Sequence, residues 1–199
     1  EFKYNPNKSR IITWTNQTVN DYNELVRKFI YGKHAVESYH VGEIIMAKKP
    51  YCVFVGRERH IIISNSEELV IKKKQTCIKE YANYSYNALQ LEAISLTDNV
   101  IRTTYVVEGS EKQKYISDII KLKELASNEK DRDYAKSLWR KYFVLIELFG
   151  DMQYAYALTA YKAQGSTFDN VYVVAENIRK MPNMHIRNQC LYTALSRCK

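Results

Sequence analysis

The stretch from Tyr156 to Val174, YALTAYKAQGSTFDNVYVV, carries the pattern on which the fold prediction rests. Its ends are rich in apolar, aromatic and β-branched residues, which predict strands at about 155–161 and 171–174 because such side chains suit a buried pleated surface. Between them, residues 162–167 supply a lysine, two hydroxyl groups and a glycine that permits close backbone approach. Backbone N–H groups beside hydroxyls and a positive charge suit phosphate oxygens. The turn therefore indicates a polyanion site, with a solvated loop as the alternative.

Two further stretches occur in a set order with this turn. A strand at residues 10–15 ends in Thr15-Asn16, and the helical segment YTALSR occupies residues 192–197. Together with T-x-x-K-x-Q-G-S-T at residues 159–167, they resemble the second motor domain of superfamily 1 DNA helicases. The resemblance is to the five-prime-to-three-prime branch of Dda-like and RecD-like enzymes. It also includes the segments TNQTVNDYN and VGEIIMAKKP, so it is spread over most of the chain.

The resemblance implies an α/β fold, namely a RecA-like second motor domain of the P-loop NTPase type with an inserted small antiparallel β-barrel of the Src-homology-3-like class. The residue pattern agrees, because short alternating runs with Gly, Pro or Asn breaks follow residue 41. We expect residues 1–40 to form the first part of RecA-like domain 2A and residues 41–108 to form the barrel domain 2B. Residues 109–199 are expected to form a helical pair and the second part of domain 2A.

Two helices carry apolar stripes that we expect to face the core. The first follows Thr15, with Asn16 or Thr18 as its cap, and a second begins near residue 184. The first stripe consists of Tyr22, Leu25, Val26, Phe29 and Ile30, and the second of Leu191, Ala194, Leu195 and Cys198. Trp139 lies on another apolar stripe, which favours a core role over a stacking surface for nucleic-acid bases.

Arg197 is the candidate catalytic residue. It lies about 100° around the helix from the centre of its apolar stripe, so it points away from that helix's core. A surface arginine is the simple interpretation. The family resemblance implies instead an arginine finger that reaches the γ-phosphate of ATP held by a preceding domain.

The other candidate site residues follow from the same resemblance. Candidate nucleotide contacts are Gln164, Gly165, Ser166 and Thr167. Candidate contacts to single-stranded DNA are Thr15, Asn16, Thr159, Tyr161 and Lys162. The sequence departs from the family at two of these positions, since the family usually has His where Tyr161 stands and many relatives carry an acid where Thr167 stands. These departures concern the family's phosphate contact at position 161, where tyrosine can still donate a hydrogen bond or stack, and its ribose contact at position 167.

Charge and composition narrow the class of partner. The formal net charge of +8 favours a polyanion such as nucleic acid over a membrane surface, because no basic amphipathic anchor helix accompanies it. The sequence has no long apolar run and no signal peptide, so a soluble protein is expected. The family resemblance implies the cytoplasm of a bacterial or phage-infected cell. The four cysteines are too scattered for a metal site or a disulfide scaffold.

The 199 residues contain no G-x-x-x-x-G-K-[ST] phosphate loop. We therefore expect an excised part of an ATP-dependent helicase that couples ATP hydrolysis to translocation and unwinding, with the isolated fragment inactive. ATP and Mg²⁺ would be bound mainly by the absent N-terminal motor domain, and none tightly by this chain. Expected partners are single-stranded DNA, with RNA as an alternative track, and that N-terminal domain, in a monomer. A RecD-like subunit of a recombination nuclease complex and a non-catalytic nucleic-acid-binding module are the competing interpretations.

Overall fold

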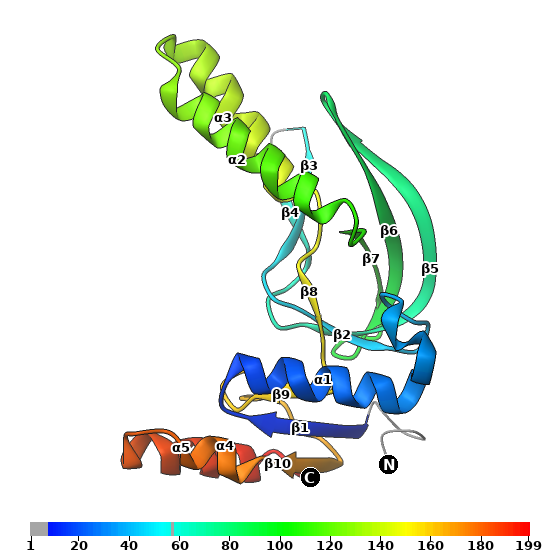
Figure 1. Ribbon diagram of the computed structural model, residues 1–199, viewed down its shortest axis with the longest axis vertical. Helices are drawn as coiled ribbons and strands as arrows, with labels where there is room; N and C mark the ends of the chain where they lie inside the picture. The colour runs from blue at the N-terminus through cyan, green and yellow to red at the C-terminus, as the bar shows by residue number, and fades with distance from the viewer. Residues whose placement is uncertain (1–7, 57) are drawn as a thin grey trace. The chain divides into compact units, whose positions relative to one another are not determined.

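The chain divides into two units. The computed structural model describes residues 8–56 and 58–199, and Figure 1 traces their helices and strands. Unit 1 consists of Glu1–Ser38, Glu43–Ile45 and Tyr154–Lys199, and unit 2 of Tyr39–Gly42 and Met46–Gln153. Unit 2 is thus inserted into unit 1. The chain passes from one to the other within β2 (Ile44–Ala47) and again within β8 (Met152–Tyr154).

In the part of the chain that the structure describes, unit 1 is built around a three-stranded parallel sheet with the order β10-β1-β9. The middle strand, β1 (Ser9–Thr13), is buried along its whole length, as a strand covered on both faces of a parallel sheet should be. Its neighbours β9 (Ala157–Thr159) and β10 (Asn170–Val173) run in the same direction. The predicted α/β class is confirmed. β9 is shorter than predicted because turns begin at residue 160.

Three helices of unit 1 pack against this sheet, namely α1 (Asn16–Tyr31), α4 (Ala175–Arg179) and α5 (Met184–Leu195), and the 3-10 helix η2 (Gly32–Val36) follows α1 and contacts it. Gly32 has a φ of 56°, a conformation that suits a residue without a Cβ, and it ends α1. α1 packs on β1 and β9, whereas α4 contacts β1 and α5 contacts β10.

A buried ion pair holds α1 to a later segment of unit 1. Arg27 Nε lies 2.6 Å from Glu43 Oε1, and the two side chains are 3% and 0% exposed. The other guanidinium nitrogens donate hydrogen bonds to the carbonyl oxygens of Ala35 and Glu37, and the group stacks on Tyr154. Burial lowers the pKa of Arg27, but the hydrogen bond and charge of Glu43 outweigh it, so the pKa is raised overall.

This ion pair explains why the predicted stripe on α1 is wrong in part. Val26 is buried, but Leu25 and Phe29 are 61% and 66% exposed. The buried face instead includes two polar residues, Asn23 and Arg27. Asn23 exchanges two hydrogen bonds with the backbone of Ala157, and Arg27 is paired with Glu43. Because both polar side chains have partners inside unit 1, burying them carries little penalty.

The stripe predicted on α5 is also wrong in part. Ala194 is fully buried, whereas Leu195 and Cys198 are exposed. The helix ends at Leu195, so Cys198 lies beyond it. There the backbone forms an isolated parallel bridge between Phe168 and Cys198. The helical spacing that placed Cys198 on the stripe therefore does not apply to it.

Unit 2 consists mainly of antiparallel strands. β5 (Glu68–Tyr81) and β6 (Tyr84–Ser95) form a long hairpin, and β7 (Ile101–Val107) pairs with residues 88–94 of β6. The hairpin therefore continues beyond β7 as a two-stranded ribbon that ends at residues 82–83, as Figure 1 shows.

The predicted barrel is not found. β3 (Tyr51–Val55) and β4 (Glu58–Ile63) form a two-stranded sheet of their own. β7 is the edge strand of the sheet that contains β5 and β6. Closing a barrel requires every strand to pair on both sides, and the described strands leave these edges open. The alternating runs that follow residue 41 do form β-strands. Their pairing is what differs from the prediction.

Two helices, α2 (Lys112–Asn128) and α3 (Arg132–Ile146), complete unit 2. They pack on the hairpin around an aromatic core, in which Tyr86, Tyr115 and Phe149 meet edge to face at centroid distances of 5.0–5.8 Å. The Tyr86 hydroxyl donates a hydrogen bond to Asp118, and burial with this neighbour raises the pKa of Tyr86. None of the described helices in either unit combines the length and hydropathy that a membrane crossing requires.

Candidate nucleic-acid interface

A groove of about 480 Å³ opens in unit 1 where β1 and β9 end. Open parallel sheets place ligands at the carboxyl ends of their strands, which is the edge that this groove occupies. Five predicted site residues line it, namely Asn16, Thr159, Tyr161, Lys162 and Gln164. The fold thus brings the β1–α1 corner and the turn after β9 together around one concave surface.

The β1–α1 corner holds its shape through Thr15, and the predicted cap was wrong. Thr15 is the N-cap of α1, since its Oγ1 accepts a hydrogen bond of 3.3 Å from the Thr18 N–H. The cap falls one residue earlier than Asn16 because Thr15 has the extended backbone and the hydroxyl that the position needs. Asn16 becomes the first helical residue, with an exposed side chain on the groove. Thr15 itself is not among the residues that line the groove.

Asn177, which the sequence analysis missed, clamps the same corner from α4. Its Oδ1 accepts hydrogen bonds from the Trp14 N–H at 2.8 Å and the Thr15 N–H at 3.2 Å. Its Nδ2 donates to Thr18 Oγ1 at 2.9 Å. One amide side chain therefore satisfies two N–H groups that no helical carbonyl can reach. The sequence signal that could have identified Asn177 is its position shortly after the end of a predicted strand.

The turn after β9 presents its side chains toward the groove. Thr159 Oγ1 accepts a hydrogen bond from the Lys162 N–H at 3.3 Å, which closes the first turn. Gly165 has a φ of 90°, a conformation that a residue with a Cβ rarely adopts. Tyr161 is 84% exposed, so the face of its ring is open to a stacking partner. Lys162 and Gln164 line the groove beside it.

Arg197 contacts this turn through Ser166. Its Nη1 donates to the Ser166 carbonyl oxygen at 3.4 Å, and its Nε and Nη2 donate to Thr193 O and Ser196 Oγ. These acceptors are neutral, and among the ion pairs of residues 8–56 and 58–199 none involves Arg197. No carboxylate of the described residues therefore balances the charge of this guanidinium beside the turn. Of the predicted nucleotide contacts, only Gln164 lines the groove.

The rest of the groove lining comes from residues that were not predicted as site residues. They are Trp14, Ala160, Met181, Ile186, Gln189, Cys190 and Thr193. Gln189 and Thr193 are four residues apart on α5, a spacing that places both on one helix face and could have identified them. Burial raises the pKa of the Cys190 thiol, which therefore stays protonated at neutral pH.

Comparison with known proteins assigns a class to this part of the chain. Residues 154–199 match the UvrD-like helicase C-terminal domain family. The matched region contains β9, the turn, β10, α4, α5 and Arg197. The match supports a superfamily 1 helicase C-terminal domain and, with it, a helicase-related function that involves nucleotide and nucleic acid.

Particular relatives extend the comparison to more of the chain. An uncharacterized protein of Acanthamoeba polyphaga mimivirus is 24% identical over an alignment of 224 positions that covers 94% of this chain and 45% of that protein. An uncharacterized protein of Methanocaldococcus jannaschii is 40% identical over 67 residues, which cover 32% of this chain and 5% of that protein. The chain therefore spans less than half the length of each of these relatives.

Proposed function

We propose that this chain supplies the second motor domain of an ATP-dependent DNA helicase of superfamily 1, in the five-prime-to-three-prime branch of Dda-like and RecD-like enzymes. One observation carries the proposal. The turn at residues 160–167 lines the groove through Tyr161, Lys162 and Gln164, and it accepts a hydrogen bond from Arg197 through Ser166. A single short segment thus connects the candidate contacts to single-stranded DNA with Arg197, the candidate arginine finger.

In this proposal, unit 1 is the RecA-like domain 2A and residues 41–108 form the inserted domain 2B. The groove of unit 1 holds the backbone of single-stranded DNA. Lys162 attracts phosphates, Asn16 and Thr159 donate hydrogen bonds, and Tyr161 stacks on a base. Thr15 acts indirectly, because it caps α1 and thereby fixes the position of Asn16. None of these contacts is made to a base edge, so binding does not depend on the base sequence of the DNA.

The nucleotide would be bound at the other side of the turn. The residues present fit only the γ-phosphate end of ATP, because Arg197 offers a charged fork of donors, and the exposed Gly165 and Thr167 offer backbone groups and a hydroxyl. Among the described residues, no group of three or more His, Cys, Asp or Glu side chains could hold a metal ion. Mg²⁺, which neutralises phosphate charge when bound, would therefore be held by a preceding nucleotide-binding domain.

Arg197 would stabilise the negative charge that develops on the transferring phosphoryl group, an effect worth about 10³ to 10⁵ in rate for such fingers. ATP would bridge the preceding domain and this chain, and hydrolysis would release the bridge. Because the turn joins Arg197 to the groove, closure around ATP and the grip on the strand would change together. Alternating grip converts this cycle into movement along the strand.

The contact with single-stranded DNA is tested by titrating a fluorescein-labelled oligo(dT) of 15 nucleotides with the protein. Fluorescence anisotropy measures the binding at several salt concentrations. Lys162→Ala should weaken binding and reduce the slope of log K against log[salt] by about 1. Lys180→Ala removes an exposed lysine outside the groove and is the matched control. Equal slopes for wild type and Lys162→Ala would exclude the strand contact.

A further inference from the structure

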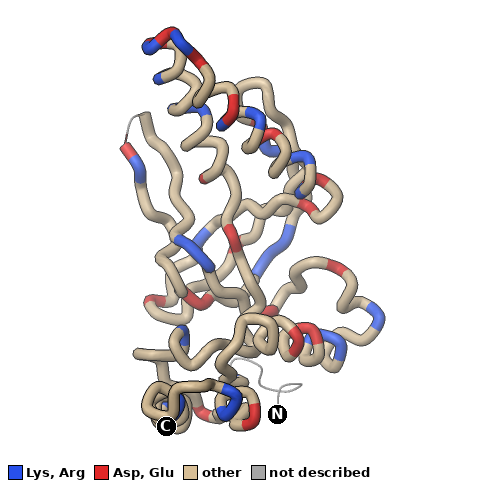
Figure 2. Tube along the Cα trace, turned by 60° about the vertical axis from the view of Figure 1, so that its left-hand side comes forward, with Lys and Arg blue, Asp and Glu red and all other residues tan. Residues whose placement is uncertain are grey.

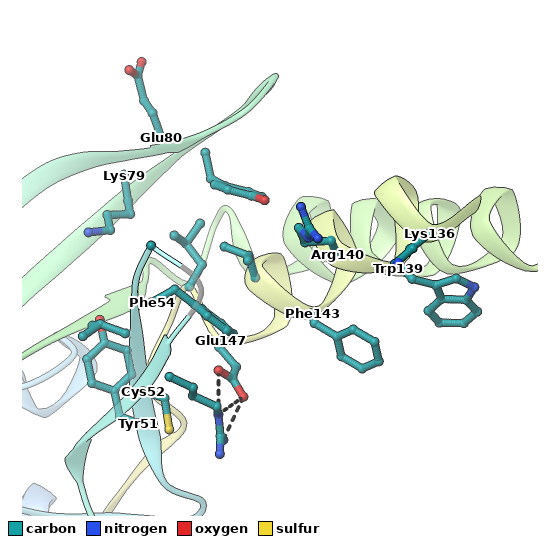
Figure 3. Close-up of a pocket in the computed structure, with 16 residues that line it drawn as sticks. Tyr51, Cys52, Phe54, Lys79, Glu80, Lys136, Trp139, Arg140, Phe143 and Glu147 are labelled. Carbon is teal, nitrogen blue, oxygen red and sulfur yellow. Dashed lines mark hydrogen bonds and ion pairs between the residues drawn. The ribbon is translucent and has the colours of Figure 1, made fainter. Parts of the chain in front are cut away.

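Unit 2 contains a second groove, of about 960 Å³, that the proposed function does not use. Its sides come from the β3–β4 hairpin, from the end of β5 and from α3 (Figure 3). All of the residues that line it belong to unit 2. Its lining contains aromatic rings and basic side chains, the combination that single-stranded nucleic acid requires.

The aromatic part of this groove lies on α3. Trp139 and Phe143 are one turn apart, with ring centroids 6.0 Å apart and planes inclined by 30°. Figure 3 shows both rings projecting from the same side of the helix. Phe143 is 52% exposed, while Leu138 and Leu145 of the same helix are buried in the core. Trp139 is half-buried and packs against the core of unit 2, as its apolar stripe predicts, so only part of its ring, together with the exposed Phe143 ring, is open to a ligand.

Positive charge flanks these rings. Lys136 and Arg140 are exposed, lie one turn apart on α3 and form no ion pair among the described residues. Arg140 is close enough to Tyr81 of β5 for its charge to oppose the rise in the Tyr81 pKa that burial causes. The rows Lys136–Arg140 and Trp139–Phe143 thus run side by side along the helix.

The other charged groups of the groove either have partners within unit 2 or lie at the edge of the groove. Arg59 donates two hydrogen bonds, of 2.8 and 3.0 Å, to the Glu147 carboxylate, so this pair is neutral. Lys79 lies 3.7 Å from the centroid of the Tyr105 ring. Glu80 is an exposed acid at the edge. The charges left available beside the rings are therefore those of Lys136 and Arg140.

We propose that this groove of unit 2 is a second binding site for single-stranded nucleic acid, in which Trp139 and Phe143 stack on bases while Lys136 and Arg140 contact phosphates. Flat ring faces next to unpaired cations match the alternation of base and phosphate along a strand. An acidic peptide would satisfy the two cations but would not need planar partners for the rings. Figure 2 shows that lysines and arginines are spread over many elements, so the rings, rather than a single basic patch, define this site.

The chain's two tryptophans allow the two grooves to be observed separately, because Trp14 lines the groove of unit 1 and Trp139 that of unit 2. In the Trp14→Phe variant, Trp139 is the only tryptophan. We expect a saturating 15-nucleotide oligo(dT) to quench its emission and to lower its accessibility to acrylamide. An abasic oligonucleotide of the same length should cause neither change, because it has phosphates but no bases. Anisotropy of the labelled probe establishes saturation independently.

Two substitutions test the contacts themselves. Trp139→Ala should weaken oligo(dT) binding by about tenfold, within the range expected for loss of one base stack. Lys136→Ala should reduce the salt slope by about 1, whereas Lys123→Ala on the outer surface of α2 should leave it unchanged. The Trp139→Phe variant, in which Trp14 is the reporter, follows the groove of unit 1 in the same titration.

Unchanged emission and accessibility of Trp139 at saturation would overturn the proposal. If Trp14 responded in that titration and Trp139 did not, the proposed function would stand and the second site would be excluded. Without oligonucleotide, the accessibility of Trp139 to acrylamide could instead fall as the protein concentration rises. That result would show that a second copy of the chain occupies the groove, and it would also overturn the proposal.

Discussion

Arg197 and Ser166 are joined by a hydrogen bond of 3.4 Å from the guanidinium Nη1 to the carbonyl oxygen. The main chain reinforces the contact, because the Arg197 carbonyl accepts a hydrogen bond of 2.8 Å from the Phe168 N–H. Arg197, two residues beyond the end of α5, is thereby held to the turn after β9 by both its side chain and its backbone, so its position does not follow from the helical spacing used in the sequence analysis. Any rearrangement of this turn must therefore move the Arg197 guanidinium.

Arg197→Ala should lower ATP turnover by at least about 10³-fold in the protein that joins this chain to a nucleotide-binding domain. The affinity for single-stranded DNA should stay within about twofold, since Arg197 does not line the groove. Arg197→Lys keeps the charge but loses the fork of donors, so it should recover only part of the rate. The measurement is steady-state hydrolysis with saturating oligo(dT). Near-normal turnover by the alanine variant would remove the catalytic role.

Gly165→Ala should destabilise the protein by about 1–2 kcal/mol, because the φ of 90° forces an added Cβ into a left-handed conformation. No atom lies within 4 Å of that Cβ, so the penalty comes from the backbone alone. Gly109→Ala is the matched control, since its Cβ is equally free and its φ is not positive. Thermal unfolding of both variants is the measurement. Equal melting temperatures would show that the turn adapts without strain.

Asn177→Ala should reduce the free energy of unfolding by about 1–3 kcal/mol and weaken oligo(dT) binding. The substitution leaves the Trp14 and Thr15 N–H groups without their acceptor and loosens the β1–α1 corner. Asn188→Ala, at an exposed position of α5, should change stability by less than about 0.5 kcal/mol. Urea denaturation measures both. A loss of the same size in the two variants would argue against the clamp.

Glu43→Ala should cost about 3–5 kcal/mol, because it leaves the buried Arg27 without its carboxylate. Glu92→Ala removes a carboxylate from the exposed pair with Lys73 and should cost less than about 1 kcal/mol. The double variant Arg27→Met with Glu43→Leu should recover much of the loss, since it buries no charge. The measurement is thermal unfolding. A cost for Glu43→Ala no larger than that for Glu92→Ala would contradict the role of burial.

Local patterns predicted the strands and helices well. Apolar and β-branched runs marked β1 and β10 to within one or two residues. The order of the short motifs also indicated the helicase class that residues 154–199 match. These features depend on residues close together in the chain, where side-chain shape and backbone geometry act directly.

Features that depend on distant partners came only from the tertiary structure. The barrel prediction failed because strand composition does not say which strand edges pair. The face of α1 was misjudged because Arg27 is stabilised by Glu43, a residue in a later segment. Asn177 reaches the β1–α1 corner across 162 positions of sequence for the same reason. The sequence thus determined the elements and the order of the motifs, whereas long-range hydrogen bonds and charge pairing decided which of their faces are buried and which line the grooves.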